Sequence, residues 1–199
     1  MLKNVDDTKR NMGISLAAAI PEIGGSLAFF LDKILPSEIQ NKYYNFLQSL
    51  SHDVDYLKIQ VSEDIIKSDE FISLFNKTID AVMCECSELK LTIFRNILLS
   101  SLEEQHEVNY GDFFLHLLSK LSEEEIKWLF LADLCEKNGT QSPSSYYVKH
   151  HRESDNSLVL HITTKLIRYK LINGNKVSNL GRMFIKYINS SNDISNTIF

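Results

Sequence analysis

The interval between apolar residues is the feature that most constrains how this chain can fold. From residue 37 to about 66, large apolar side chains recur every three or four positions, at Ile39, Tyr43, Phe46, Leu47, Leu50, Val54, Leu57 and Val61. Residues at this interval share one face of an α-helix, whereas a half-buried strand alternates apolar and polar residues. The same interval returns over 68–102 and 110–120, and Ser87-Glu88 is a point at which the longer stretch can divide. The sequence therefore predicts a series of amphipathic helices.

Short polar connections separate these helices, which favours side-by-side packing of sequence neighbours. We expect an antiparallel bundle of about four to six helices over residues 12–120, after a flexible arm over 1–11. On the helix over 110–120, we expect four residues to be buried: Phe113, Phe114, Leu117 and Leu118.

The most apolar part of the chain lies within this region, over residues 12–35. It consists of two runs, 14–20 and 23–31, separated by Pro21-Glu22. Neither run reaches the roughly 20 apolar residues of a membrane-spanning helix. Small residues in both runs would let two short helices approach closely. We expect core packing, with a membrane surface or a partner-protein groove as alternatives; the contact residues would then be Ile20, Gly24, Gly25, Phe29 and Phe30.

Residues 121–189 carry the signals of a second module. Ser122-Glu123-Glu124-Glu125 fits a capping box at a helix start, and Gly139 ends that helix. A later amphipathic helix over 158–169 has an apolar face of Leu158, Val159, Ile162, Leu166 and Tyr169. Asn173-Gly174-Asn175 then reads as a hairpin turn, and Ser178 as the start of a last helix. This order of elements resembles a winged helix, followed by a flexible tail over 190–199.

The expected fold is therefore mainly α, with an N-terminal antiparallel helical bundle, a C-terminal winged-helix-like module and a small β-hairpin. The helix that begins at Ser122 carries a wider apolar arc than a small winged helix can cover. We expect Trp128 on that arc to be buried where the two modules meet.

The charge of the chain is distributed unevenly. Residues 1–137 carry 13 basic and 23 acidic residues, a net charge of −10, whereas residues 138–199 carry 8 and 3, a net charge of +5. An acidic surface repels nucleic acid and a basic one attracts it. On the helix over 158–169, one polar stripe holds cations for phosphates and short polar groups for base edges. The candidate nucleic-acid contacts are Lys149, Arg152, His161, Thr164, Lys165, Arg168 and Lys176; the alternative is a solvated face on a module that binds protein.

Catalytic and metal-binding patterns are weak throughout the sequence. Cys84 and Cys86 fall in a helical stretch, where residues two apart point roughly 200° away from each other, so we do not expect them to hold a metal together. His52-Asp53 is the pair found in helical metal-dependent phosphohydrolases, but His106 and His116 are too sparse to complete such a site. We expect no enzymatic activity, no metal and no cofactor.

Two segments together resemble a known group of proteins. The first is Ala17-Ala18-Ala19-Ile20-Pro21-Glu22-Ile23-Gly24-Gly25, and the second is Val177-Ser178-Asn179-Leu180-Gly181-Arg182-Met183-Phe184. They resemble bacterial proteins of the abortive-infection alpha type and related helical proteins of phage-defence islands. In that type the last helix begins with a Thr-x-x-Gly-like turn, and here Ser178 stands in the place of the threonine. The resemblance implies a role in bacterial phage defence.

We therefore expect a non-enzymatic interaction protein that contacts a partner protein or itself through its helical bundle. A DNA-binding regulator acting through the basic module is the first alternative, and a membrane-acting effector acting through residues 12–35 is the second. Three cysteines, an odd number, and a polar start without a secretory signal indicate a reducing compartment, which predicts a cytoplasmic location.

Overall fold

The described part of the chain is mainly helical. The computed structural model describes residues 37–57, 63–102, 108–139, 143 and 156–189. Over these residues it has eight helices and one antiparallel sheet of two strands, so the prediction of a mainly α fold with a small hairpin is confirmed. None of the described helices combines the length and the apolar character that crossing a membrane requires.

Two compact units make up the chain, Met1–His116 and Leu117–Phe199. The division falls within helix α7 (Val108–Lys120). The first unit also contains α3 (Ser37–Leu57), α4 (Glu63–Ile66), α5 (Asp69–Cys84) and α6 (Glu88–Leu102). The helix predicted over 37–66 is described as α3 and α4, and residues 58–62 between them lie outside the described part.

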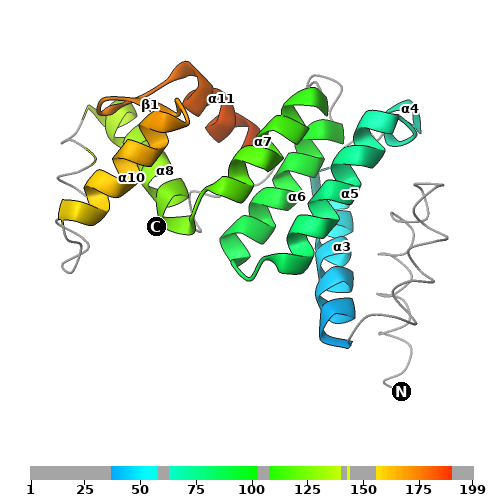
Figure 1. The fold of residues 1–199 in the computed structure, drawn as a ribbon. Coiled ribbons are helices and arrows are strands. Elements are labelled where there is room, and N and C mark those ends of the chain that lie inside the picture. Colours follow the sequence, from blue (N-terminus) through cyan, green and yellow to red (C-terminus); the bar gives the residue numbers. More distant parts are fainter. Residues whose placement is uncertain (1–36, 58–62, 103–107, 140–142, 144–155, 190–199) are drawn as a thin grey trace. The chain divides into compact units, whose positions relative to one another are not determined.

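Helices α3, α5 and α6 pack against one another, and the short α4 packs on α5 (Figure 1). Their shared core contains Tyr43, Phe46, Leu47, Leu50, Phe71, Leu74, Phe75, Val82, Ile93, Phe94, Ile97 and Leu98. Ser68 begins α5 by accepting a hydrogen bond from the backbone N–H of Phe71, at 3.2 Å. Helix α5 ends at Cys84 and α6 begins at Glu88, which confirms the predicted division at Ser87-Glu88.

The prediction that α7 buries Phe113 is wrong, because that side chain is 46% exposed. Phe114, Leu117 and Leu118 are buried as expected, and Leu115 joins them. Consecutive helical residues lie about 100° apart, and the buried arc extends from Phe114 toward Leu115 rather than back toward Phe113.

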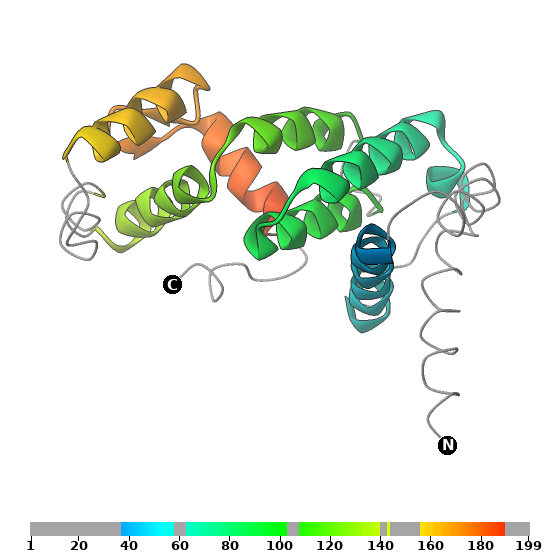
Figure 2. The same ribbon diagram turned by 60° about the horizontal axis from the view of Figure 1, so that its bottom comes forward.

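The second unit is built around α8 (Glu123–Asn138). Helix α8 contacts α10 (Asn156–Arg168), strand β2 (Lys176–Val177) and α11 (Asn179–Ile188), while α10 contacts β1 (Ile172–Asn173) (Figure 2). The core between them contains Ile126, Trp128, Leu129, Ala132, Val159, Ile162, Leu166, Leu171, Ile172, Val177, Phe184 and Ile188. Leu158, predicted on the apolar face of α10, is 42% exposed in the first turn of the helix, whereas Val159, Ile162 and Leu166 of the same predicted face are buried.

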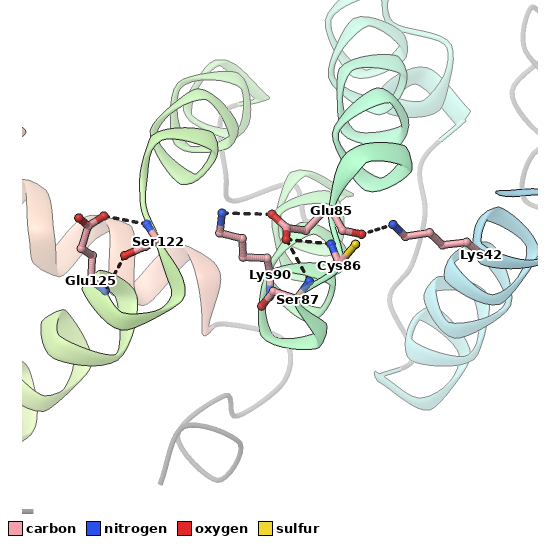
Figure 3. Close-up of polar contacts among 7 residues, drawn as sticks. All are labelled: Lys42, Glu85, Cys86, Ser87, Lys90, Ser122 and Glu125. Atoms are coloured by element: carbon pink, nitrogen blue, oxygen red, sulfur yellow. Dashed lines mark hydrogen bonds and ion pairs between the residues drawn. The ribbon is translucent and has the colours of Figure 1, made fainter. Parts of the chain in front are cut away.

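Helix α8 has the predicted caps at both ends. The N–H of Ser122 donates to Glu125 Oε2 at 2.7 Å, and the N–H of Glu125 donates to Ser122 Oγ at 3.3 Å, which is a capping box (Figure 3). Gly139 ends the helix with φ of 62°, in the left-handed region that glycine adopts without steric cost.

The hairpin β1–β2 closes through two residues. Ile172 pairs with Val177 and Asn173 with Lys176, which leaves Gly174-Asn175 as the turn. Gly174, with φ of 61°, stands at the first central position, the place where type II′ hairpin turns use glycine. Ile172 and Val177 are buried on one side of the ribbon, whereas Asn173 and Lys176 are exposed on the other.

Ser178 joins three elements of this unit. Its hydroxyl donates to the carbonyl of Lys170 at 2.5 Å, beyond the end of α10, and accepts from the N–H of Gly181 at 2.9 Å, in the first turn of α11. Its own N–H donates to the carbonyl of Leu171. A Cβ on Gly181 would collide with the carbonyl oxygen of Leu171 and lie 2.8 Å from Val177 Cγ1. The serine and the glycine three residues later therefore let α11 start against the base of the hairpin.

Candidate functional site

The outward face of α10 is the best-defined candidate surface. Leu160 is 67% exposed and Ile167 is 48% exposed. At about 100° per residue, the interval of seven places them on one line along the helix, and His161 and Arg168 form a parallel line about 100° away. Thr164 lies between the two lines, and all five residues are exposed. We call these five residues the α10 face; one edge is apolar and the other is polar and basic.

Lys165, predicted to belong to the exposed polar stripe, instead pairs with a carboxylate of α8. Its Nζ is 2.8 Å from Oε2 of Glu125, and the two side chains are 29% and 3% exposed. The same carboxylate is the acceptor of the capping box at the start of α8. A buried carboxylate without a cation beside it is strongly destabilising. Lys165 supplies this cation, so its side chain links α10 to α8 and faces the interior of the unit.

The remaining candidate nucleic-acid contacts divide into two groups. His161, Thr164 and Arg168 are exposed on α10, and Lys176 is exposed on the outer side of the hairpin. Lys149 and Arg152 lie outside the described residues. The structure therefore leaves one of the two fixed cations of the predicted stripe, Arg168, available on the helix.

Sequence reasoning missed a third cation beside the hairpin. Lys170, just after α10, has φ of 58°. Its N–H donates to the carbonyl of Ile167, and that of Leu171 donates to Leu166, the bond pattern of a Schellman motif. Glycine is usual at the left-handed position of this motif. Lys170, Arg168 and Lys176 form no ion pair within the described part of the chain.

A carboxylate on α8 holds the hairpin and α11. Glu136 Oε2 accepts from the N–H of Val177 at 3.1 Å, and Oε1 pairs with Arg182 Nη1 at 3.1 Å. The hydrogen bond from Arg182, then that from Val177, and the charges of Arg182 and Lys176 lower the pKa of Glu136 below its ordinary value of 4.5. Arg182 is thus a structural cation, so two of the six described basic residues of the C-terminal region, Lys165 and Arg182, bind carboxylates of α8.

The apolar residues of the α10 face were visible in the sequence but were not singled out. Leu160 and Ile167 are spaced by seven positions on a face that is otherwise polar, and such a pair is the signal of an exposed apolar line. Exposed aromatic residues also occur in the first unit, at Tyr56, Tyr110 and Phe113. The predicted membrane or partner contacts Ile20, Gly24, Gly25, Phe29 and Phe30 lie outside the described residues.

The His52-Asp53 pair has a structural role. His52 Nδ1 lies 3.9 Å from Asp53 Oδ1, and Asp53 Oδ2 accepts from Arg95 Nε at 3.0 Å, so the carboxylate links α3 to α6. Within the described ranges, no three His, Cys, Asp or Glu side chains gather in a way that could hold a metal ion.

The placement of Cys84 and Cys86 differs from the prediction. The sequence predicted both in one continuous helix, but α5 ends at Cys84, and Cys86 lies in the connection to α6. Both cysteines are exposed, whereas Cys135 is buried. The helical separation of roughly 200° therefore does not apply to them.

No family model matches the chain, and neither a curated protein nor a solved structure matches it.

Proposed function

We propose that this chain is a non-enzymatic interaction protein whose C-terminal unit is a winged-helix-like module that binds a partner protein through the α10 face. The observation that carries the proposal is the exposure of Leu160 and Ile167 on one line of the helix. Exposed apolar residues that lie together, rather than singly, mark binding surfaces. The withdrawal of Lys165 to Glu125 supports the same conclusion, because it leaves the face with Arg168 as its one fixed cation.

The chemistry of the α10 face defines the kind of partner. Leu160 and Ile167 need an apolar strip on the partner, whereas His161 and Arg168 favour acceptors or carboxylates beside that strip. An amphipathic helix with acidic residues along one side offers both. A setting in bacterial phage defence, which the resemblance of the two sequence segments implies, belongs to this proposal.

Copurification with a matched pair of variants tests the proposal. The tagged chain would be isolated from cells that express it naturally, as the parent, as Leu160→Asp and as Lys186→Asp. Lys186 is exposed on α11 and does not belong to the α10 face. We expect a protein that is retained by the parent and by Lys186→Asp and is lost with Leu160→Asp, while the melting temperatures stay close. An identical set of retained proteins for all three chains would contradict the proposal.

Binding of a nucleic-acid duplex is a second candidate, and one observation favours it. Lys170 occupies a left-handed position where glycine would cost less, between the end of α10 at Arg168 and the hairpin that carries Lys176. A residue other than glycine in the left-handed region is grounds for a hypothesis of function. A cation at that position would contact phosphates.

The variant Lys170→Gly tests whether Lys170 binds a duplex or is a left-handed residue without a role in binding. The variant should be more stable than the parent, because relief of about 1–2 kcal/mol of left-handed strain outweighs the entropy cost of glycine, about 0.5–1 kcal/mol. If the hairpin binds a duplex, the variant should also bind it more weakly, with a shallower salt dependence. If the parent has a dissociation constant of only about 10⁻⁴–10⁻⁶ M at physiological salt and Lys170→Gly has the same value, the binding is nonspecific and this candidate is wrong.

A further inference from the structure

The connection between α5 and α6 carries two exposed thiols one residue apart. Cys84 is the last residue of α5, Glu85 follows as its cap, and Cys86 precedes Ser87 and the start of α6. Neither thiol takes part in the core, and neither is joined to another cysteine. The surface interaction of α10 makes no use of this segment.

The backbone at Glu85 sets the distance between the two cysteines. Glu85 has φ of −95° and ψ of 139°, which is extended. The Cα separation of residues i and i+2 depends on the dihedral angles of the residue between them, and for an extended residue it is twice the rise of about 3.3 Å, roughly 6.6 Å. A direct disulfide needs a Cα separation of about 4.4–6.8 Å, so this pair lies near the upper end of that range. A single atom that bridges the two sulfurs, with each bond about 2.3 Å long, spans such a gap more readily.

The segment between the thiols is held by its own contacts (Figure 3). Glu85 Oε1 accepts from the N–H of Cys86 at 2.9 Å and from the N–H of Ser87 at 3.0 Å, and Oε2 pairs with Lys90 Nζ at 3.1 Å. Lys42 Nζ, from α3, donates to the carbonyl of Glu85. Burial raises the pKa of Glu85, but the hydrogen bonds from Ser87, Lys90 and Cys86 outweigh it and leave this pKa lowered. The carboxylate that fixes the turn is therefore ionised at neutral pH.

We propose that Cys84 and Cys86 bind one soft, monovalent, two-coordinate cation of the cuprous type between their sulfurs. Thiolates select soft ions, and cuprous copper is one of the ions that cysteine ligands favour. Zinc in a structural site takes four ligands, and no group of three His, Cys, Asp or Glu that could hold a metal is present in the described part of the chain. The pair therefore fits an ion that two ligands satisfy.

Charge balance agrees with this assignment. Binding converts two thiols into two thiolates, releases two protons and leaves a complex with one net negative charge, with no change in oxidation state. Lys42 reaches the backbone of the turn, and Lys90 neutralises the Glu85 carboxylate that would otherwise add a second negative charge. The turn thus places two lysine cations next to the segment that would carry the negative complex.

Anaerobic titration of the full, reduced chain tests the proposal. Cuprous ion would be supplied from a coloured chelator of known affinity, and its transfer to the parent, to Cys84→Ser, to Cys86→Ser and to Cys135→Ser would be measured. Cys135 is buried in the other unit and serves as the matched control. We expect the parent and Cys135→Ser to take up one ion per chain. Either of the other variants should lose more than roughly tenfold in affinity, since even an outer-shell partner contributes that much.

X-ray absorption on the loaded parent should find two sulfur neighbours around the ion and no nitrogen or oxygen at bonding distance. Three results would overturn the proposal: no transfer from the chelator, equal uptake by the parent and by either of the two single variants, or a complex of two chains per ion in sedimentation. Rapid closure of a Cys84–Cys86 disulfide by oxidised glutathione, which excludes the ion, would overturn the geometric argument as well.

Discussion

Glu125 shows how one residue can serve two elements. Its carboxylate caps the start of α8 and pairs with Lys165 of α10, and its side chain is almost fully buried. The capping role was readable from Ser122-Glu123-Glu124-Glu125 because a capping box is a local pattern. The ion pair was not readable, because Lys165 is distant in sequence and the helical period alone places it at the border between the buried and exposed sides of α10.

Lys165→Met should destabilise the chain, whereas Arg168→Met should not. The methionine keeps the length of the side chain but leaves the buried Glu125 carboxylate without its cation. We expect a loss of about 1–2 kcal/mol, less than for a fully buried pair because Lys165 remains partly in water. Arg168 is exposed, so its change should stay within about 0.5 kcal/mol. Chemical denaturation of the two variants and the parent measures both values, and equal losses would contradict the assignment of Lys165 to the interior.

Because of Glu136, the second unit should lose stability as the pH falls through the acidic range. Its pKa is lowered in the folded chain, so the ionised carboxylate stabilises the fold above pH 4.5, and this contribution is lost as the pH falls through the folded pKa. Glu136→Gln should therefore melt below the parent at pH 7, and the difference should shrink as the pH falls below 4.5. Asp80→Asn, an exposed change on α5, is the control. A difference that stays constant down to acidic pH would show that the carboxylate charge is not what holds Arg182 and Val177.

Three local constraints meet at the junction of α10, the hairpin and α11 in the second unit. Ser178 bonds across it, Lys170 adopts a left-handed conformation within it, and Gly181 leaves room for the backbone of Leu171. The serine and glycine of this junction are the same residues that resemble a Thr-x-x-Gly-like turn. Their spacing has a physical reason here: a cap hydroxyl at the first position and a missing Cβ at the fourth.

Gly181→Ala should destabilise the chain more than Asn179→Ala, an alanine substitution at an exposed position in the same turn of α11. The added methyl group would meet the Leu171 carbonyl and Val177, so α11 or the hairpin must shift. We expect a cost of about 1–3 kcal/mol, typical of overpacking. Asn179→Ala, at the exposed start of α11, is the matched control and should cost less than about 1 kcal/mol. A neutral result for Gly181→Ala in thermal unfolding would mean that α11 does not press against the hairpin.

The elements were more predictable than the faces they present. Helix positions, the division between α5 and α6, the caps of α8 and the hairpin all follow from local spacing and turn residues. The exposure of Phe113, Leu158, Leu160 and Ile167 does not, because it depends on which partner helix covers each side. The extended conformation of Glu85 was not predicted either, in this case because of the local pattern. The apolar spacing of α5 and α6 continues through their connection, so the connection resembles a helix.

In the core of the second unit, Trp128 is the buried side chain whose loss we expect to be most costly. It is the largest of the fully buried side chains, and its Nε1–H has no hydrogen-bond partner among the described residues. Its predicted burial is confirmed, while its predicted role in joining the two units stays a prediction. Among candidate site residues, the polar edge of the α10 face was predicted, and the apolar edge was missed.

Trp128→Ala should lower stability by about 3–5 kcal/mol, the usual cost of removing a large aromatic side chain from a core. Trp128→Phe should cost less, because it keeps most of the volume and removes a buried donor that has no acceptor. Differential scanning calorimetry decides whether the loss affects one transition or separates the melting of the two units. A parent-like single transition in Trp128→Ala would contradict the core role of this residue.

Site-specific photocrosslinking tests whether the α10 face binds a protein. A photoreactive amino acid would replace Leu160 in the full chain, with the same replacement at Lys186 as the control, and cells that express the chain naturally would be irradiated. We expect a discrete adduct at position 160 that resists nuclease, is digested by protease, disappears when Ile167→Asp is added and is absent at position 186. An adduct at position 160 that nuclease removes, or equal adducts at both positions, would contradict this expectation.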